Sequence, residues 1–260
     1  MKIDFEKFQA AGNDFILIDN RKNQLSNIQT NEIIVLCDRK FGVGSDGLIL
    51  LNTHQSRDFE MLFYNPDGSQ SFCGNGARCA IVYALQHDFP LQAFAFSAID
   101  GNHAFRMDQN LPSLQMKDVN EILLIDQNSA LLDTGSPHYV LFSDDLSTEN
   151  VLQTGRNIRF SENYKKEGIN VNLIQKVDSS TIRIATFERG VENETLSCGT
   201  GATASVLFYA HTLGLSSGTI QVHTKGGTLR VSFDKHQTDL FQNVWLTGPA
   251  SYVFSGFITR

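Results

Sequence analysis

The sequence predicts an α/β protein made of two similar halves, and three observations lead to this fold class. Short segments that alternate apolar and polar residues, as strands do, recur along the 260 residues and are separated by apolar-periodic runs typical of helices. Two of those runs open with nearly the same motif, Cys-Gly-Asn-Gly-Ala-Arg-Cys-Ala at 73–80 and Cys-Gly-Thr-Gly-Ala-Thr-Ala-Ser at 198–205. The order strands, helix, strands, cysteine motif, helix, strands occurs around each motif, which indicates an internal duplication.

In the first half, a helix is expected at 30–37, because apolar residues recur there at helical spacing behind a polar Thr-Asn-Glu start. A second helix follows the first cysteine motif at 77–86. Asp100 and Gly101 form a common hairpin dipeptide, which joins two strands within 92–107. The other strands are predicted at 2–8, 15–19, 47–51 and 59–64.

The second half repeats this order after a break at 110–113, Asn-Leu-Pro-Ser. Helices are expected at 148–154 and 202–213, the second of them behind the second cysteine motif. A pair of glycines at 226–227 marks a turn. The strands of this half are predicted at 130–133, 139–142, 170–176, 181–187, 219–224, 228–233 and 244–247.

A chain of 260 residues can bury two cores of ordinary size. We therefore expect two domains, one formed by 1–116 with 247–260 and the other by 117–246. No low-complexity linker separates them, so they should pack together around a shared cleft.

Composition argues against several classes of partner. The net charge is −7 and the pI about 5.4, without any acidic or basic block, so a nucleic-acid partner is not expected. No apolar stretch is long enough for a signal core or a membrane span, which favours a soluble cytoplasmic protein with no membrane partner. In a reducing compartment its four cysteines would be buried, metal-binding or catalytic, not cross-linked.

Cys73 and Cys198 carry the strongest functional signal. Each stands where an apolar helix begins, so the free backbone N–H groups and the helix dipole should favour its thiolate. The neighbouring glycines leave room for an anionic ligand on the same amides. Inversion of a carbon centre needs one acid–base group on each face, so a pair of such thiols suggests proton transfer on both faces of one carbon.

Eight motifs in order then resemble one family, diaminopimelate epimerase, a cofactor-independent enzyme of lysine and peptidoglycan precursor synthesis. They are Ala-Gly-Asn-Asp-Phe at 11–15, Gly-Val-Gly-Ser-Asp-Gly at 42–47, Phe-Tyr-Asn-Pro-Asp-Gly-Ser at 63–69, Cys-Gly-Asn-Gly-Ala-Arg-Cys at 73–79, Pro-His at 137–138, Asn170, Glu-Arg-Gly at 188–190 and Cys-Gly-Thr-Gly at 198–201. The resemblance implies two α/β domains related by a pseudo-dyad. Each would be a curled, barrel-like mixed sheet around a central helix, with the active site in the cleft between them.

The resemblance also implies the reaction and its residues. The enzyme would interconvert LL- and meso-2,6-diaminoheptanedioate, a small amino-acid substrate with two carboxylates, with no cofactor and no metal. Cys73 and Cys198 would be catalytic, and the enzyme could form a homodimer. Substrate contacts are implied for the side chains of Asn13, Asn65, Asn170, Glu188 and Arg189 and for the backbone amides of Gly74, Asn75, Gly199 and Thr200. His138 and Glu188 are candidates for tuning the pKa of a thiol.

The chain departs from the family pattern at three positions. Ala10 replaces a common glycine, Gly47 stands where some members have a substrate-contacting glutamine, and Ser136 replaces a common asparagine. The segment between Glu188 and Cys198 is also one residue longer than in some relatives, which a surface loop should tolerate.

Other interpretations remain open at this point. The two-cysteine architecture is shared by racemases and epimerases of histidine, hydroxyproline or other amino acids. A thiol redox switch is a less favoured alternative, and a zinc site that uses Cys73 and Cys79 lacks the usual ligand spacing. Cys37 and Cys79 are expected to be small core residues.

Overall fold

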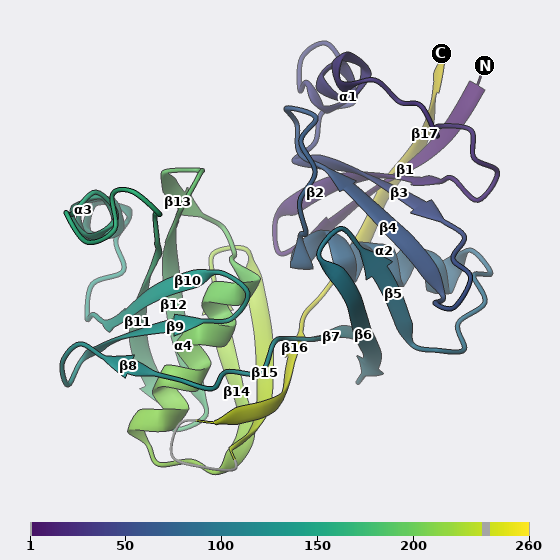
Figure 1. Cartoon of the computed structure of the whole chain (residues 1–260). Helices are drawn as coiled ribbons and strands as arrows, with labels where there is room; N and C mark the ends of the chain where they lie inside the picture. Colours follow the sequence, from purple (N-terminus) through teal and green to yellow (C-terminus); the bar gives the residue numbers. More distant parts are fainter. Residues whose placement is uncertain (1, 236–239, 260) are drawn as a thin grey trace. The chain divides into compact units, whose positions relative to one another are not determined.

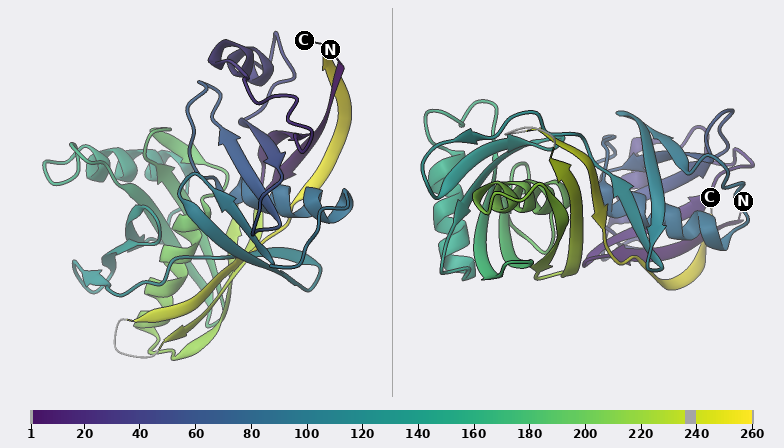
Figure 2. Two further views of the ribbon diagram at one scale, coloured as in Figure 1. Left: turned by 45° about the vertical axis from the view of Figure 1, so that its right-hand side comes forward. Right: turned by 90° about the horizontal axis from the view of Figure 1, so that it is seen from below.

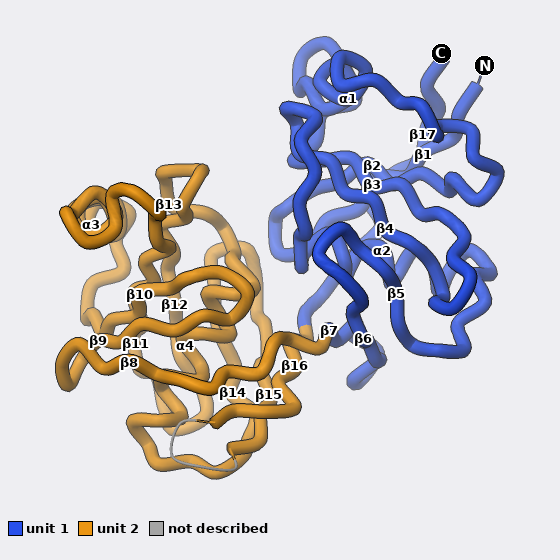
Figure 3. Tube along the Cα trace, viewed as in Figure 1, with its two compact units in different colours: residues 1–114, 248–260 blue, residues 115–247 orange. Residues whose placement is uncertain are grey.

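The computed structural model describes residues 2–235 and 240–259 and divides into two compact units (Figure 3). Unit 1 comprises 1–114 and 248–260, and unit 2 comprises 115–247. Each unit combines helices with a mixed sheet, so the predicted α/β class is confirmed (Figure 1). Within the described ranges, no helix is both long and apolar enough to cross a membrane.

Unit 1 contains a mixed sheet with strand order β17-β1-β2-β3-β4-β5-β6, and β7 pairs antiparallel with β6. Its strands are β1 Lys2–Ala10, β2 Asn13–Asp19, β3 Gly47–Asn52, β4 Phe59–Tyr64, β5 Ala95–Ala98, β6 Gly101–Asp108, β7 Leu111–Gln115, which crosses the unit boundary, and β17 Ser251–Thr259. Its helices are α1 Thr30–Cys37 and α2 Gly74–Gln86.

Unit 2 has a mixed sheet with strand order β8-β9-β10-β11-β12-β14-β15-β16, and β13 pairs with the end of β12. Its strands are β8 Leu123–Leu124, β9 Ser129–Asp133, β10 Pro137–Phe142, β11 Asn170–Asp178, β12 Thr181–Glu188, β13 Asn193–Thr195, β14 Ser217–Thr224, β15 Gly227–Lys235 and β16 Phe241–Thr247. Its helices are α3 Thr148–Arg159 and α4 Gly199–Thr212.

The two units share one topology. From β1 to β6 the pairings run antiparallel, parallel, antiparallel, parallel and antiparallel, and the same series recurs through β9, β10, β11, β12, β14 and β15. Each parallel connection contains one helix. In unit 1 these helices are α1 and α2, and in unit 2 they are α3 and α4. The repeated order of elements that the sequence predicted is therefore present in the fold.

One helix in each unit forms the centre of the core. In unit 2, α4 contacts strands β9, β10, β11, β12, β14, β15 and β16, and these strands surround it in Figure 2. All residues from Gly201 to Ala210 are buried, as expected for a helix that is apolar on every side. In unit 1, α2 packs on β1, β2, β3 and β4. The outer helices α1 and α3 pack on β3 and on β11 and β12, respectively.

Strand alternation in unit 2 decides which side chains meet the central helix. Val171 and Leu173 of β11 pack with Val151 of α3, whereas Ile174 belongs to the core around α4. Successive side chains of a strand point to opposite faces, so Asn172 lies on the α4 side of the sheet. A polar group is thereby placed inside the core of unit 2, where it needs hydrogen-bond partners.

Several elements differ from the prediction. The segment 110–113, expected to be a break, lies largely in β7, because these residues pair antiparallel with the end of β6. Pro112 is the second residue of this strand, opposite Met107. Strand β17 was not predicted, since its consecutive apolar residues lack alternation, yet it pairs along β1. The short strands β8 and β13 were also missed, and α3 extends to Arg159 instead of ending at residue 154.

Candidate active site

Both motif cysteines are helix N-caps, as the sequence predicted. Cys73 precedes α2 with extended backbone, and its Sγ accepts a hydrogen bond from the Gly76 N–H at 3.4 Å. Cys198 precedes α4 in a similar conformation, and the residue is 8% exposed. Since α2 begins at Gly74 and α4 at Gly199, the first-turn N–H groups lie directly beside each sulfur. Both thiols are therefore placed where a helix dipole favours negative charge.

The register of the two sheets shows which residues of the two repeats correspond. Phe15 of β2 is opposite Gly47 of β3, and His138 of β10 is opposite Asn170 of β11. When the repeats are aligned on these pairs, Asn13 corresponds to Ser136, Gly47 to Asn170, Asn65 to Glu188, Asn75 to Thr200 and Gly76 to Gly201. Each unit thus contains one set of these residues, called half-site 1 around Cys73 and half-site 2 around Cys198.

Half-site 1 is organised by Asn13. Its Nδ2 donates to Asp46 Oδ2 at 2.6 Å, which leaves Oδ1 to accept from Asn75 Nδ2 at 3.2 Å and from the Cys73 thiol at 3.8 Å. Arg78, which has no exposed surface, donates from Nη2 to Asn75 Oδ1 at 2.7 Å. These contacts fix the orientation of both carboxamides, so a carbonyl oxygen faces the Cys73 sulfur.

Asp46, the residue that orients Asn13, belongs to a cluster of charged side chains. Asp46 and Asp14 both accept from Arg39 at 2.6 Å, and Asp14 also pairs with Lys7 at 2.6 Å. Burial opposes ionisation of Asp14, but the bonds from Arg39 and Lys7 outweigh it and lower its pKa to about 2. The Asp46 carboxylate that orients Asn13 is itself held by Arg39 and by the Asp14 N–H, which donates to its Oδ2 at 3.2 Å.

Two further positions of unit 1 lie outside this arrangement. Asn65 donates to the hydroxyls of Ser69 and Ser71, both at 3.1 Å, in the loop between β4 and α2. A Cβ at Gly47 would overlap the ring of Phe63 and lie 2.8 Å from the Tyr64 carbonyl oxygen. The glutamine that some relatives have at that position therefore cannot fit here without a shift of β4.

Half-site 2 contains a continuous chain of polar side chains. It runs from Thr186 Oγ1 to Asn172 Oδ1 at 2.9 Å, from Asn172 Nδ2 to His138 Nδ1 at 2.9 Å, and from His138 Nε2 to Ser136 Oγ at 3.0 Å. It continues from Ser136 Oγ to Thr200 Oγ1 at 3.3 Å and ends at Cys198 Sγ, 3.4 Å from Thr200 Oγ1. The polar Asn172, between the apolar Val171 and Leu173 of β11, was the available sequence signal for this chain, and it was missed together with Thr186.

His138 is a buried, neutral member of that chain. It has no exposed surface, and burial lowers the pKa of its imidazole to about 3. Ser136 and Thr200 stand between its ring and the Cys198 sulfur.

This burial predicts a pH-dependent stability. Below its ordinary pKa of 6.5, residue 138 takes up a proton in the unfolded chain but not in the folded protein, which binds it only near pH 3. Stability should therefore fall as the pH drops through this window, by up to about 1.4 kcal/mol per pH unit from this group. Urea unfolding near neutral pH and near pH 5 measures how steeply the free energy of unfolding changes with pH. This slope should be shallower in His138→Gln. An unchanged slope in that variant would contradict the assignment.

The remaining implied contacts lie at the start of β11 and at the end of β12. Asn170 Oδ1 accepts from the Arg189 N–H at 2.9 Å, and Asn170 Nδ2 donates to Ser136 Oγ at 3.2 Å. The Arg189 guanidinium donates to the Glu167 carbonyl at 2.9 Å on the surface. Burial raises the pKa of Glu188. Asn170 thus links the β12 terminus to half-site 2, while Glu188 and the Arg189 side chain lie outside the polar chain.

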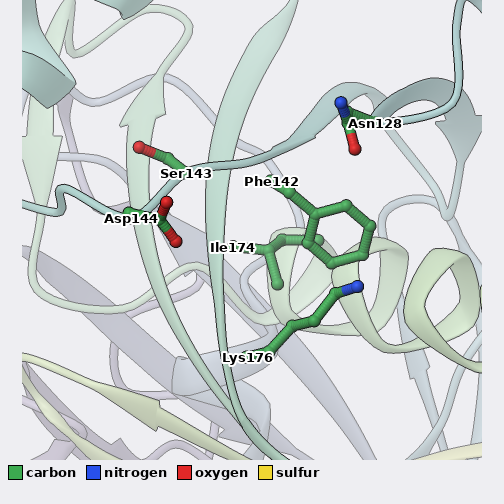
Figure 4. Close-up of a pocket in the computed structure, with 6 residues that line it drawn as sticks. All are labelled: Asn128, Phe142, Ser143, Asp144, Ile174 and Lys176. Atoms are coloured by element: carbon green, nitrogen blue, oxygen red, sulfur yellow. The ribbon is translucent and has the colours of Figure 1, made fainter.

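Two cavities contain none of the implied site residues. One of about 600 Å³ lies in unit 1 between β1, β17 and the end of α2. The other, of about 330 Å³ in unit 2, is drawn in Figure 4 and is lined by Asn128, Phe142, Ser143, Asp144, Ile174 and Lys176. Within 2–235 and 240–259, no three His, Cys, Asp or Glu side chains are grouped so that they could hold a metal ion.

Comparison with known sequences gives one consistent family. A sequence profile described as diaminopimelate epimerase matches residues 5–110 and 130–253. The diaminopimelate epimerase of Flavobacterium psychrophilum is 46% identical, over 95% of this chain and 97% of its own length. That of Chlorobaculum tepidum is 37% identical, over 96% of this chain and 99% of its own length.

Solved structures share the fold at low identity. A phenazine biosynthesis protein of the PhzF family from Bacillus anthracis has a TM-score of 0.73 and 12% identity, with both chains fully covered. A probable proline racemase from Agrobacterium radiobacter has a TM-score of 0.70 and 13% identity, over 99% of this chain and 93% of its own. At these identities the likeness concerns the fold alone.

Proposed function

Because this chain belongs to the diaminopimelate epimerase family, we propose that it interconverts LL- and meso-2,6-diaminoheptanedioate by proton transfer at one α-carbon. One observation carries the proposal. The two repeats cap their central helices with Cys73 and Cys198, and the implied contacts Asn65 and Glu188 stand at corresponding positions, as do Asn75 and Thr200.

In this mechanism the two sulfurs act on opposite faces of the α-carbon. One enters as thiolate and removes the α-proton, so the C–H electron pair is delocalised into the adjacent carboxylate. The other enters as thiol and returns a proton to the opposite face. The products are the inverted substrate and a protein whose thiolate and thiol have exchanged, so the reverse reaction uses the same groups.

The charge that develops on the substrate carboxylate has to be stabilised by the protein. The first-turn amides of α2 and α4, at Gly74, Asn75, Gly199 and Thr200, offer hydrogen-bond donors and the positive ends of two helix dipoles. Such preorganised donors stabilise the transition state more than the ground state, because the negative charge there is greater.

The rest of the proposed site selects the substrate. Arg189 would bind the distal carboxylate with its planar guanidinium, and Glu188, Asn13, Asn65 and Asn170 would bind polar groups of the substrate. A polar site of this kind disfavours amino acids without a second amino-acid group, because its hydrogen-bonding groups would then stay unpaired.

Location and assembly are proposals of the same kind. We expect the reaction to take place in the cytoplasm without cofactor, nucleic acid or membrane partner, and we expect a homodimer. The carboxyl-terminal strand β17 supports the last expectation, since Tyr252, Val253, Phe254 and Phe257 expose 44–58% of their surface.

The test is hydrogen exchange in deuterated water. Incubation with LL-diaminoheptanedioate should yield the meso form with deuterium at the inverted carbon, detected by NMR and by chiral chromatography. Proline, hydroxyproline and histidine should not exchange. Exchange with one of those amino acids and not with diaminoheptanedioate would assign the protein to a sister racemase. Turnover that persists without both thiols would support the redox-switch alternative.

A further inference from the structure

The hydrogen positions along the polar chain of half-site 2 can be assigned from its partners. The Tyr139 carbonyl can only accept, so it is the Asn172 amide nitrogen that lies 3.4 Å from it and 2.9 Å from His138 Nδ1. The Thr186 hydroxyl donates to the Asn172 carbonyl oxygen at 2.9 Å, in agreement with this orientation. His138 Nδ1 is therefore an acceptor, and the neutral ring carries its proton on Nε2.

Ser136 then receives two hydrogen bonds. One comes from His138 Nε2 at 3.0 Å. The other comes from Asn170 Nδ2 at 3.2 Å. The orientation of this carboxamide is fixed by two neighbours. The Arg189 N–H can only donate, so it lies beside Oδ1, and the Pro137 carbonyl can only accept, so it lies beside Nδ2. A hydroxyl oxygen has two lone pairs, so both are occupied.

The hydroxyl hydrogen of Ser136 must therefore point onward to Thr200 Oγ1 at 3.3 Å. Thr200 in turn lies 3.4 Å from Cys198 Sγ, and its backbone carbonyl is held by the Thr134 hydroxyl at 2.9 Å. If Cys198 is a thiolate, the Thr200 hydrogen is donated to the sulfur and every hydrogen along the chain has an acceptor. If Cys198 is a thiol, its hydrogen and the Thr200 hydrogen compete for the single place between Sγ and Oγ1.

We propose that Ser136 and Thr200 are positioning residues that direct a donated hydrogen bond onto the Cys198 sulfur and so stabilise its thiolate form. A hydrogen bond to the charged form of a group favours that form. The role of this thiolate as a base rests on the proposed function. At the position that corresponds to Ser136, half-site 1 has the carboxamide of Asn13, whose oxygen faces Cys73. The hydroxyl relay is therefore specific to half-site 2.

Two charged groups affect His138, the ionisable member of the relay. Asp133, at the end of β9, favours the protonated form of His138 and Arg189 opposes it, and burial outweighs both. Glu188, at the end of β12, follows Phe187, which pairs with Val171 of β11, and burial raises its pKa. The relay thus consists of neutral donors, and its effect on Cys198 should persist at high salt.

The test follows the ultraviolet absorbance of the Cys198 thiolate during a pH titration. The Cys73→Ser variant isolates this signal, and a Cys73→Ser/Cys198→Ser variant supplies the baseline for the tyrosines and the two other cysteines. Thr200→Val keeps the shape and the backbone amide but removes the hydroxyl. It should move the titration midpoint to higher pH by about one unit, the loss expected for a hydrogen bond to a charged group.

Two further variants separate the relay from simple packing. Thr200→Ser keeps the hydroxyl and should leave the midpoint within about 0.3 units. Ser136→Ala should shift it in the same direction as Thr200→Val, but less, because the Thr200 hydroxyl remains and only its orientation is lost. An unmoved midpoint in Thr200→Val, an equal shift in Thr200→Ser, or no shift in Ser136→Ala would each overturn the proposal.

The same variants give a second readout in the otherwise unmodified enzyme. In Thr200→Val the acidic limb of kcat for the direction that uses Cys198 as base should move to higher pH by the same amount, with little change in KM. The absorbance titration does not depend on any substrate. A shifted midpoint without diaminoheptanedioate turnover would therefore refute the proposed function and leave the relay standing.

Discussion

Replacing either Cys73 or Cys198 with serine should reduce epimerisation by at least about 100-fold, the lower end of what one acid–base group contributes. A serine hydroxyl has a similar shape but ionises only far above neutral pH, so it can neither remove nor return the α-proton. The loss should appear in kcat in both reaction directions, because each direction needs one thiolate and one thiol. Chiral chromatography of LL and meso forms after timed incubation measures it.

A buried cysteine outside the half-sites provides the control. Cys37 is the buried last residue of α1, and the Ser45 hydroxyl donates to its sulfur at 3.4 Å. Burial raises the pKa of its thiol. Cys37→Ala should retain the epimerisation rate within a few-fold. Substantial activity in Cys73→Ser or in Cys198→Ser would exclude the two-base mechanism, whatever the behaviour of the control.

The second large effect is expected on stability, in Gly201→Ala. A Cβ at residue 201 would overlap Asn172 Oδ1, and the buried Asn172 cannot move away without breaking its bonds to Thr186 and His138. Overpacking together with a broken buried hydrogen bond should cost about 3 kcal/mol or more of the free energy of unfolding. This exceeds the gain of about 1 kcal/mol that alanine brings to a helix.

The duplicated fold supplies a matched control at the corresponding position. At Gly76 a Cβ would meet the ends of Ile49 and Met61, at 3.0 and 3.3 Å, and both flexible side chains can give way. Gly76→Ala should therefore change stability by less than about 1 kcal/mol. Urea unfolding followed by the fluorescence of Trp245, the single tryptophan, which lies in β16, reports unit 2, and circular dichroism reports both units. Equal losses in the two variants would contradict this account.

Much of the candidate site could be predicted because local chemistry determines it. Glycines beside Cys73 and Cys198, followed by apolar runs, are sufficient to place a thiol at a helix N-terminus, since helix capping depends on a few adjacent residues. The strands with clear alternation were found for the same reason. By contrast, β17 has no alternating pattern and depends on its distant partner β1, so periodicity could not reveal it.

The sequence by itself determined the α/β class, the duplicated order of elements, the two cysteine N-caps and the resemblance to one family, because these depend on short-range patterns and motifs. Only the tertiary structure decided which polar side chains are connected to each sulfur by hydrogen bonds. Asn172 and Thr186 come from β11 and β12, and Ser136 comes from the connection between β9 and β10. They join Thr200 of α4 in one chain only because sheet register and the glycine at 201 bring these segments together. Hydrogen bonds between residues so far apart in the chain carry no local sequence signal, so the partners of each thiol follow from the fold.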